Sequence, residues 1–463
     1  MPESYDTIIV GMGASGCTAA STLAKAGKKV LALEAMDRIG GRVNTVPFGD
    51  GVVELGAEWI HGQFPSRVYD LAVQNNVSIL PQDLDFDVYR SDGSSGDKDI
   101  LNELMTFSLG VVDDPPETPE PLGKYITKRL MEYIQTKHPE LLKDKDFIDE
   151  LLQFMDLIID NYESSNSWND VSTQSRYEEL RGNQHMSWHR HGYKTLFEIL
   201  LNTYNNGPGH PTLDIKLNKE VTLITWPQDP AQDVLVTCKD GASYRAKNVI
   251  VTMSLGVLKE RHNTLFSPSL PQEKVTSIEK LSIGVVGKVV LLFEKAFWNR
   301  TIWYPFLWKA EDRRKLSKED YWVTNLSGGT PPMGSPNVMT LWSCGDVAKL
   351  VETLPEDVVK RKVMELIRRF MGKNRTIPEP IAMLRSSWYS NPYTRGSYTF
   401  DNVLTPQYPH ARATLGEPLL DSSGAPRVLF AGEATDSTHF STVHGATDTG
   451  FREASRLLPQ SKL

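Results

Sequence analysis

The sequence predicts an α/β fold with two domains, one of them assembled from three separate stretches of chain. The 463 residues exceed what one hydrophobic core usually serves. A strand, a glycine-rich turn and a helix open the chain, and similar strand patterns return in its middle and near its end. The segments between them have helical and mixed-strand patterns of their own. We therefore expect a first domain at 1–75, 190–284 and 395–463, and a second, α+β domain with a mixed sheet and helices at 76–189 and 285–394.

The composition is that of an ordinary globular chain and restricts the class of partner. Hydrophobic residues make up 40% of the chain and charged residues 23%. Asp and Glu (58) outnumber Lys and Arg (50), and the net charge of −8 argues against a nucleic-acid partner and is compatible with a cationic substrate. Cys17, Cys238 and Cys344 match no metal-ligand spacing, so no metal site is expected. No apolar run is long enough to span a membrane.

The glycine-rich turn near the N-terminus predicts a dinucleotide-binding element. A β-rich run, YDTIIV, leads into GMGASG and a helix of small residues, and the next strand ends in an acid. This order gives the G-x-G-x-x-G pattern the context it requires, because glycines let the backbone approach a pyrophosphate at the helix N-terminus. The acid can accept hydrogen bonds from a ribose diol. The residues expected to bind the cofactor here are Gly11, Gly13, Ala14, Ser15, Gly16 and Glu34.

The residues after Glu34 make the expected cofactor more specific. They read E-x-x-x-R-x-G-G-R, with a second glycine pair that lets the chain pass close to the cofactor and an arginine that can offer a fork of donors to a phosphate. This segment resembles the FAD-binding segment of the flavin amine oxidase family. The resemblance implies a Rossmann-like FAD-binding domain and adds cofactor contacts at Arg38, Gly40, Gly41 and Arg42.

Later segments resemble the parts of that family that rejoin the FAD-binding domain. They are LNKEVTLITW (217–226), KNVIVTMSLGVLK (247–259) and the C-terminal RVLFAGEATDSTHFSTVHGATDTGFREASRLL (427–458). The resemblance places Val221 on the adenine side and Glu433 at the ribityl or phosphate region. Thr442 and Val443 would begin a helix at the flavin O2 edge, where a helix dipole stabilises the negative charge of the reduced ring.

Three further segments resemble the polyamine oxidase branch of the family. ELGAEWIHG (54–62) is similar to its flavin-proximal loop, WYSNPYTRGSYTF (388–400) to its W-x-x-x-P-Y-x-x-G-S-Y segment, and FSTVHGA (440–446) to its Y-S-T-x-H-G-A. Ser397 stands where monoamine oxidases carry the cysteine that tethers flavin, which implies a non-covalent FAD. The first two segments add cofactor contacts at Gly56, Ala57, Glu58, Trp59 and Trp388.

A charged residue interrupts the otherwise apolar strand pattern GVVGKVVLLF (284–293). Taken alone, Lys288 favours an edge strand with its side chain in water. The stretch also resembles the family's G-x-x-x-K-x-x-x-x-F, in which the lysine lies near flavin N5 and holds a water. That resemblance implies a catalytic Lys288 in a dry pocket, where desolvation disfavours the ammonium form.

The resemblance also implies which residues meet the substrate. His61 occupies the position of an ionisable catalytic group, with a purely structural histidine as the alternative, and solvent exposure is the alternative for Glu58. Tyr398 would form one wall of an aromatic cage over the flavin. Val443 replaces the aromatic wall of monoamine oxidases, which suits an open tunnel for a long, thin amine. Phe440 and Trp59 are expected to line this tunnel. Candidates for binding the distal ammonium groups are Asp83, Asp85, Asp87, Asp160 and Glu163.

Together these resemblances imply an FAD-dependent polyamine oxidase. The expected reaction oxidises the secondary amine of an N1-acetylated polyamine with dioxygen and gives an aldehyde, a shorter polyamine and hydrogen peroxide. Two alternatives stay open: a spermine oxidase that acts on unacetylated polyamine, and a catalytically inactive flavin-binding scaffold, against which Lys288 and Tyr398 argue. A histone lysine demethylase would carry a long coiled-coil insertion, and the sequence has no such heptad stretch.

The last three residues predict where the protein resides. Ser461, Lys462 and Leu463 read as a peroxisomal address. This reading implies recognition by the peroxisomal import receptor, with the cytoplasm as the alternative location. A peroxisome also contains the hydrogen peroxide that the expected reaction releases.

Overall fold

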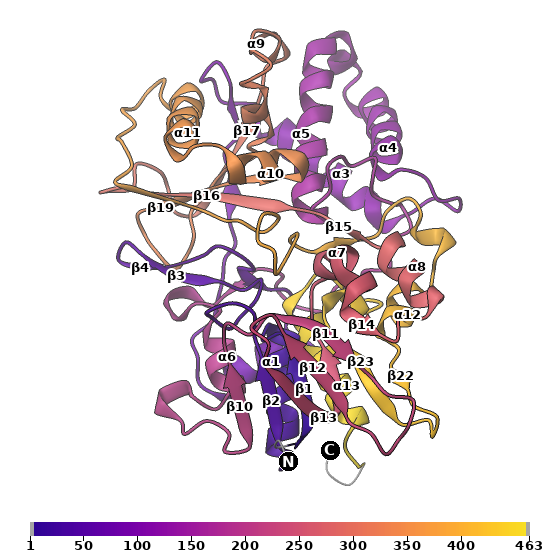
Figure 1. The fold of residues 1–463 in the computed structure, drawn as a ribbon. Helices are drawn as coiled ribbons and strands as arrows, with labels where there is room; N and C mark the ends of the chain where they lie inside the picture. The colour runs from indigo at the N-terminus through magenta and orange to yellow at the C-terminus, as the bar shows by residue number, and fades with distance from the viewer. Residues whose placement is uncertain (1–3, 460–463) are drawn as a thin grey trace.

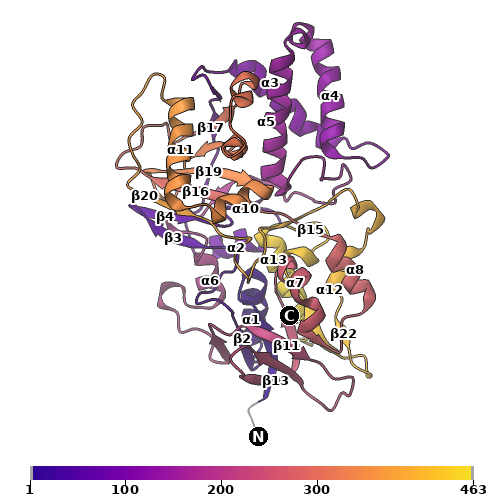
Figure 2. The same ribbon diagram turned by 45° about the horizontal axis from the view of Figure 1, so that its top comes forward.

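The chain folds into two lobes stacked one above the other (Figure 1). The computed structural model describes residues 4–459, so the expected address at 461–463 lies outside the described residues. The lower lobe of Figure 1 holds a largely parallel sheet, and the upper lobe holds a second sheet with long helices beside it. Figure 2 shows the same division after rotation. The expected mixed α/β class is therefore confirmed.

The lower lobe is built on a sheet whose central strands run parallel. Their order is β10 (Leu213–Lys216), β2 (Val30–Leu33), β1 (Ser4–Val10), β13 (Ser243–Val251) and β23 (Pro426–Phe430). Three distant stretches of chain thus meet in one sheet. The first half of β13 also pairs antiparallel with β12 (Val234–Cys238), which forms a hairpin with β11 (Val221–Thr225). The short strands β14 (Phe266–Ser267) and β22 (Leu419–Leu420) extend the sheet.

Alternate residues of the parallel strands fill two separate cores. Ile8 and Val10 of β1 pack on one side, and Ile9 packs on the other. Strands that are buried on both faces are apolar throughout rather than alternating, which explains the run YDTIIV. The Ile9 side is covered by α1 (Ala14–Lys25), α2 (Arg67–Gln74), α6 (Thr195–Leu200) and α13 (Val443–Arg456). The opposite side is covered by α7 (Leu255–Leu265), α8 (Gln272–Lys280) and α12 (Ala411–Gly416).

The turn between β1 and α1 depends on glycine at two positions. Gly11 has φ +96°, a left-handed backbone conformation that residues other than glycine rarely adopt. A Cβ added at Gly16 would lie 1.9 Å from the carbonyl oxygen of Gly11. The first glycine therefore permits the sharp turn, and the other permits α1 to pack closely on it.

The upper lobe combines the two inserted segments. The main sheet runs β20 (Ala382–Arg385), β16 (Val286–Leu292), β19 (Val338–Cys344), β18 (Gly328–Thr330) and β17 (Ile302–Leu307). Two strands of the first inserted segment, β7 (Asp85–Phe86) and β8 (Tyr89–Arg90), pair with β17 of the second. The helices of this lobe are α3 (Lys98–Gly110), α4 (Leu122–Lys137), α5 (Lys145–Glu163), α9 (Ala310–Arg314), α10 (Gly345–Thr353) and α11 (Glu356–Met371). The domain boundaries themselves stay a prediction.

The strand that carries Lys288 lies inside the upper sheet. β16 pairs with β19 from Val286 to Leu292 and with β20 on its other side. Lys288 is 4% exposed, and both its backbone N–H and its carbonyl oxygen bond to Ser386. The edge-strand explanation of this lysine is therefore wrong, because a strand paired on both sides holds it away from water.

Within residues 4–459, three small sheets lie outside the two large ones. They are the hairpin β3 (Thr45–Phe48) with β4 (Gly51–Glu54), the set β5 (Trp59–Ile60), β9 (Met186–Ser187) and β6 (Leu80–Pro81), and the pair β15 (Ser282–Ile283) with β21 (Thr399–Phe400). Within residues 4–459, no helix has both the length and the apolar character needed to cross a membrane.

Lys274 of α8 is a buried lysine that caps the C-terminal end of α12. Its Nζ donates to the carbonyl oxygens of Thr414, Leu415 and Glu417 at 2.7, 2.9 and 2.7 Å. The last carbonyls of a helix have no donor within the helix, so this ammonium satisfies them. It also lies 4.3 Å from the centre of the Phe430 ring. Lys274 thus ties α8 and α12 to the sheet.

Replacing Lys274 with Met is expected to lower the free energy of unfolding by about 2–4 kcal/mol, because buried carbonyl groups lose their donor. Urea unfolding followed by circular dichroism measures the loss. Lys295→Met, at an exposed position, is the matched control and should change stability by less than about 0.5 kcal/mol. Equal losses in the two variants would contradict the capping role.

Candidate active site

The N-terminus of α1 is buried and has no side-chain cap. Gly13 is the N-cap residue, and Ala14, Ser15 and Gly16 of the first turn are all buried. The N–H groups of a first turn have no partner inside the helix. The Ser15 hydroxyl is also buried, without a hydrogen-bond partner among residues 4–459. Such unsatisfied donors fit an anionic group, and the pyrophosphate of a dinucleotide is the group that the sequence predicts here.

Glu34 and Arg38 shape the loop that faces this helix. The Glu34 carboxylate accepts the backbone N–H groups of Met12 and Met36 at 2.7 and 2.8 Å. Burial raises the pKa of Glu34, although these N–H groups partly oppose the shift. Arg38 donates to the carbonyl oxygen of Gly41 at 2.9 Å. In this structure both side chains therefore hold the glycine loop, and their contact with a cofactor stays a prediction.

Gly41 and Val221 border the same loop. A Cβ added at Gly41 would lie 3.3 Å from the Cα of Gly13, so the second glycine pair approaches the first closely. Val221 begins β11 and is 4% exposed. Two residues before it, the N–H of Lys219 donates to the carbonyl oxygen of Glu34 at 2.8 Å. The strand expected on the adenine side thus starts beside the expected ribose-binding acid.

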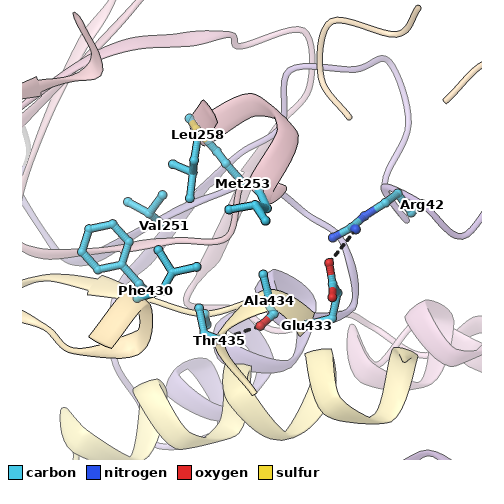
Figure 3. Close-up of a pocket in the computed structure, with 12 residues that line it drawn as sticks. Arg42, Val251, Met253, Leu258, Phe430, Glu433, Ala434 and Thr435 are labelled. Carbon is cyan, nitrogen blue, oxygen red and sulfur yellow. Dashed lines mark hydrogen bonds and ion pairs between the residues drawn. The ribbon is translucent and has the colours of Figure 1, made fainter. Parts of the chain in front are cut away.

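Arg42 and Glu433 form an ion pair beside a small cavity (Figure 3). Arg42 Nη1 donates to Glu433 Oε1 at 2.8 Å and to the carbonyl oxygen of Ser397 at 2.7 Å. Glu433 Oε2 accepts from the Thr399 hydroxyl and from the Ser441 N–H at 2.7 and 2.9 Å. Burial alone would raise the pKa of Glu433, but Arg42 and these donors outweigh it and lower the pKa.

The cavity itself is mostly apolar. Figure 3 shows Val251, Met253, Leu258 and Phe430 on one side, with Arg42 and Glu433 facing each other at the other. These residues come from all three stretches expected to form the FAD-binding domain. This apolar space has one ion pair at its margin and room for about one water molecule.

The N-terminus of α13 lies close to this pair in the sequence and in space. Thr442 is the N-cap residue, and its hydroxyl accepts the N–H of Gly445 at 3.0 Å. Ser441, which bonds to Glu433, has φ +68°. The structure thus presents a capped helix start beside Glu433, and Val443 at its first position is half-buried. Its placement at the flavin stays a prediction.

Lys288 is fully paired by the loop that follows β4. Its Nζ donates to the carbonyl oxygens of Glu54 and Gly56, both at 2.9 Å, and to Glu58 Oε2 at 2.7 Å. The Lys288 and Glu58 side chains are 3% and 9% exposed. The alternative in which Glu58 faces solvent is therefore wrong. The surroundings also differ from the expected pocket that disfavours an ammonium ion, because three acceptors match its three N–H donors.

Two aromatic rings pack against the Lys288 ammonium group and the loop that binds it. Lys288 Nζ lies 4.3 Å from the centre of the Trp342 ring, which stacks on Trp59 at 5.8 Å and 15°. Trp342 is the residue of β19 directly opposite Lys288. Trp59 Nε1 in turn donates to Gln82 at 2.7 Å. The ring faces favour the cation and fix the loop that binds it.

Trp388 and Arg42 hold this loop at residues 55–57. Trp388 Nε1 donates to the carbonyl oxygen of Leu55 at 3.0 Å. A Cβ added at Gly56 would lie 2.9 Å from the Trp388 ring, so only glycine fits there. The N–H of Ala57 donates to the carbonyl oxygen of Arg42 at 3.2 Å. The expected contacts at 56–59 and 388 are therefore neighbours in space.

His61 is a half-buried, neutral histidine. Its Nδ1 lies 2.7 Å from the carbonyl oxygen of Gln184, which can only accept, so Nδ1 carries the hydrogen. Burial, with a smaller effect from His185, lowers the pKa of His61 to about 4. The Nε2 lone pair remains available as an acceptor. The ring lies 6.3 Å from His185 and 6.5 Å from Trp59.

Tyr398 lies beside Glu163 at the end of α5. The Tyr398 hydroxyl donates to the carbonyl oxygen of Asn161 at 2.8 Å. Burial, followed by the charge of Glu163, raises the pKa of Tyr398. Tyr162, the neighbour of both Asn161 and Glu163 in the chain, is 59% exposed.

Glu163 is the one expected acidic candidate that lies beside Tyr398. It is half-buried, and its carboxylate has no hydrogen-bond partner within the described part of the chain. Burial, followed by the charge of Asp401, raises the pKa of Glu163 to about 7. Asp160 is 2% exposed and accepts from Ser165. Asp83 bonds to Asn183 and Asp85 to Lys98, while Asp87 lies in the segment between β7 and β8.

Phe440 is buried between an arginine and a second aromatic ring. It is 2% exposed, with the Arg412 guanidinium 3.6 Å from its ring centre and the Tyr177 ring packed edge-on against it. Its place on the wall of a substrate tunnel stays a prediction.

Sequence reasoning missed several residues of the site. Trp342 and His185 stand in segments with no family motif, and only the register of β19 or the fold of 183–189 brings them to Lys288 and His61. Glu54 was expected only as part of a loop, but burial raises its pKa to about 7. Within residues 4–459, no group of His, Cys, Asp and Glu side chains has the arrangement of a metal site.

The sequence of the chain matches known proteins along nearly its whole length. The family model described as flavin containing amine oxidoreductase matches residues 14–458. A bovine (Bos taurus) protein named peroxisomal N(1)-acetyl-spermine/spermidine oxidase is 31% identical, over 97% of this chain and 94% of its own length. The human (Homo sapiens) protein of the same name is 32% identical, over 99% and 95%. A probable polyamine oxidase 5 of Arabidopsis thaliana is 28% identical, over 100% and 99%.

Acid is expected to destabilise the protein through His61. Its pKa is about 4 in the folded chain and about 6.5 when unfolded, so the unfolded state binds more protons between these values. The stability that the neutral ring contributes is full above pH about 6.5 and is lost as the pH falls through about 4, a change of up to about 3 kcal/mol. Denaturant unfolding from pH 4 to 8, compared with His61→Gln, measures it.

The His61→Gln variant should show a flatter dependence of unfolding free energy on pH. His410→Gln, which removes an exposed histidine, is the control and should keep the wild-type slope. A wild-type slope in His61→Gln would show that this histidine is not held neutral by burial.

Proposed function

The chain belongs to the family of flavin-containing amine oxidoreductases, and we propose that it oxidises N1-acetylated polyamines with dioxygen through a non-covalently bound FAD. The products would be an aldehyde, a shorter polyamine and hydrogen peroxide. The observation that carries the polyamine assignment is the Glu163 carboxylate, half-buried beside Tyr398 and free of hydrogen-bond partners in the described residues. A second cationic group of a long amine would supply the charge that this acid lacks.

The proposed cofactor site uses the Rossmann-like lower lobe. Residues 1–75, 190–284 and 395–463 would form the FAD-binding domain, and 76–189 with 285–394 the substrate domain. The α1 N-terminus would hold the pyrophosphate, and Glu34 the ribose. Arg42, Glu433 and the start of α13 would contact the rest of the FAD molecule. A peroxisomal location, through the import receptor and the tripeptide at 461–463, fits the release of hydrogen peroxide and the names of the bovine and human relatives.

The proposed reaction needs an amine that loses its proton before it is oxidised. Bound FAD would supply the acceptor for a hydride equivalent from the carbon beside the secondary nitrogen and would pass the electrons to dioxygen. His61 stays neutral because burial lowers its pKa to about 4, so it adds no positive charge and can accept a hydrogen bond at Nε2. Tyr398 would restrain the amine by its ring face, and Glu163 would bind a distal ammonium. The iminium product would then hydrolyse to the aldehyde and the shorter amine.

Anaerobic addition of N1-acetylspermine is expected to bleach the yellow spectrum of the purified protein, because the amine reduces the cofactor. Spermine should bleach it more slowly if the acetylated end is preferred. Stopped-flow absorbance measures both rates. A yellow protein that no polyamine bleaches would overturn the proposed activity, and faster bleaching by spermine would favour the unacetylated substrate.

Glu163→Gln is expected to raise the apparent KM for N1-acetylspermine by about 10- to 100-fold, because one charge-assisted hydrogen bond contributes about 1.5–3 kcal/mol. The kcat should change far less, since the distal amine does not react. Steady-state oxygen consumption measures both constants. Asp85→Asn removes an exposed candidate acid and is the matched control. A KM at the wild-type value would exclude Glu163 from the substrate site.

A further inference from the structure

Glu58 stands between Lys288 and a second cavity. The cavity is lined by the β4 strand, the Glu58 side chain, the turn at 187–189 and the loop at 332–334. Lys288 does not line it. His189 and Met333 of this lining are half-exposed, so the cavity reaches toward the surface. Because Glu58 also accepts from Lys288 Nζ, its carboxylate touches both the buried ammonium and the cavity.

The other partners of Lys288 cannot exchange protons. Two of its three acceptors are backbone carbonyl oxygens, of Glu54 and Gly56, and the Trp342 ring covers the ammonium. Carbonyl groups accept hydrogen bonds but do not take up and release protons near neutral pH. Among the described residues, Glu58 is the one titratable group that bonds to Lys288. A proton that leaves Lys288 can therefore be replaced through Glu58.

We propose that Glu58 positions Lys288 and passes protons to it from water in this cavity. The proposal rests on the proposed function, because reduction of dioxygen to hydrogen peroxide consumes two electrons and two protons. Two electrons and one proton come with the hydride equivalent taken from the amine. The resemblance of residues 284–293 to the family motif implies that Lys288 lies near flavin N5, and its ammonium would supply the second proton. Glu58, protonated from bulk solvent through the cavity water, would then return a proton to the Lys288 amine and become a carboxylate again.

Other titratable groups face the same carboxylate. Glu54 lines the cavity and is held by the Thr45 hydroxyl at 2.8 Å. His189 lines it as well, and His185 lies close enough for the charge of Glu58 to affect its pKa. These groups and Lys288 surround Glu58. Any pH dependence of the transfer is therefore a property of the cluster, and the test depends on substitution rather than on a single pH value.

The test measures reoxidation separately from amine oxidation. Protein with bound FAD is reduced by dithionite, so that no polyamine is needed, and is then mixed with oxygenated buffer in a stopped-flow instrument. Glu58→Gln keeps an acceptor for Nζ but cannot carry a proton, and it should slow reoxidation by about 100-fold. Lys288→Met should slow it equally, and the double variant should be no slower than Lys288→Met alone. Asp85→Asn, in the exposed pair with Lys98, is the control.

A second measurement does not use turnover. Protein labelled with ¹⁵N at lysine Nζ reports the exchange of the Lys288 ammonium hydrogens with solvent, and loss of a signal in Lys288→Met assigns it. Met333→Trp leaves the ion pair intact but fills the cavity, and it should slow this exchange by about tenfold or more. This exchange measurement on Met333→Trp also tests the proposal if Glu58→Gln fails to fold.

Three outcomes would overturn the proposal. They are reoxidation of Glu58→Gln at the wild-type rate, a double variant slower than Lys288→Met, or unchanged exchange in Met333→Trp. Failure of the polyamine assignment would look different, since N1-acetylspermine would then fail to reduce the wild-type protein while the dithionite-reduced protein still showed the Glu58 effect.

Discussion

A buried ammonium ion imposes the geometry of the centre of this molecule. Lys288 is on a strand of the upper sheet, and all three of its acceptors come from residues 54–58, which precede the first inserted segment. An unpaired buried charge is strongly unfavourable, so the strand and the loop have to meet in one relative position. Trp342 and Trp59 close the site around the cation. The position of the lobes at this point thus follows from the pairing of one charge.

A second charged pair joins parts of the chain that are far apart in sequence. Arg42 and Glu433 are separated by 391 positions, and Ser397, Thr399 and Ser441 bond to the same pair. The loop that carries Arg42, the segment at 397–399 and the start of α13 therefore converge on the Glu433 carboxylate. Lys288 and Glu433 are both buried charges, and each is paired with a different residue of opposite charge. Each buried charge is paired by residues from another stretch, and this fixes how the stretches assemble.

The sequence predicted features that depend on local pattern and could not predict those that depend on register. The glycine turn follows from residues close together in the chain, and the return of 217–259 and 427–458 to one sheet was expected from the family resemblance of short segments. The local pattern around Lys288 alone favoured an edge strand, which is wrong because β16 is paired on both sides. Trp342 faces Lys288 because β16 and β19 pair in one register, which no local pattern specifies. The contacts of Phe440 with Arg412 and Tyr177 could not be predicted for a similar reason, since those two residues come from distant segments. The choice of Glu163 among five acids required the end of α5 to be placed beside Tyr398.

The place of β23 in the lower sheet has a consequence for biosynthesis. β23 pairs with β13, and α13 packs against α1, so residues 426–456 complete the layer that begins at residue 4. A growing chain exposes β1, β2 and β13 long before their last neighbour leaves the ribosome. Contacts between such distant residues form slowly because a long loop has to close first. The lower sheet therefore becomes complete only after nearly the whole chain has been made, and a chain that ends before residue 426 lacks both β23 and Glu433.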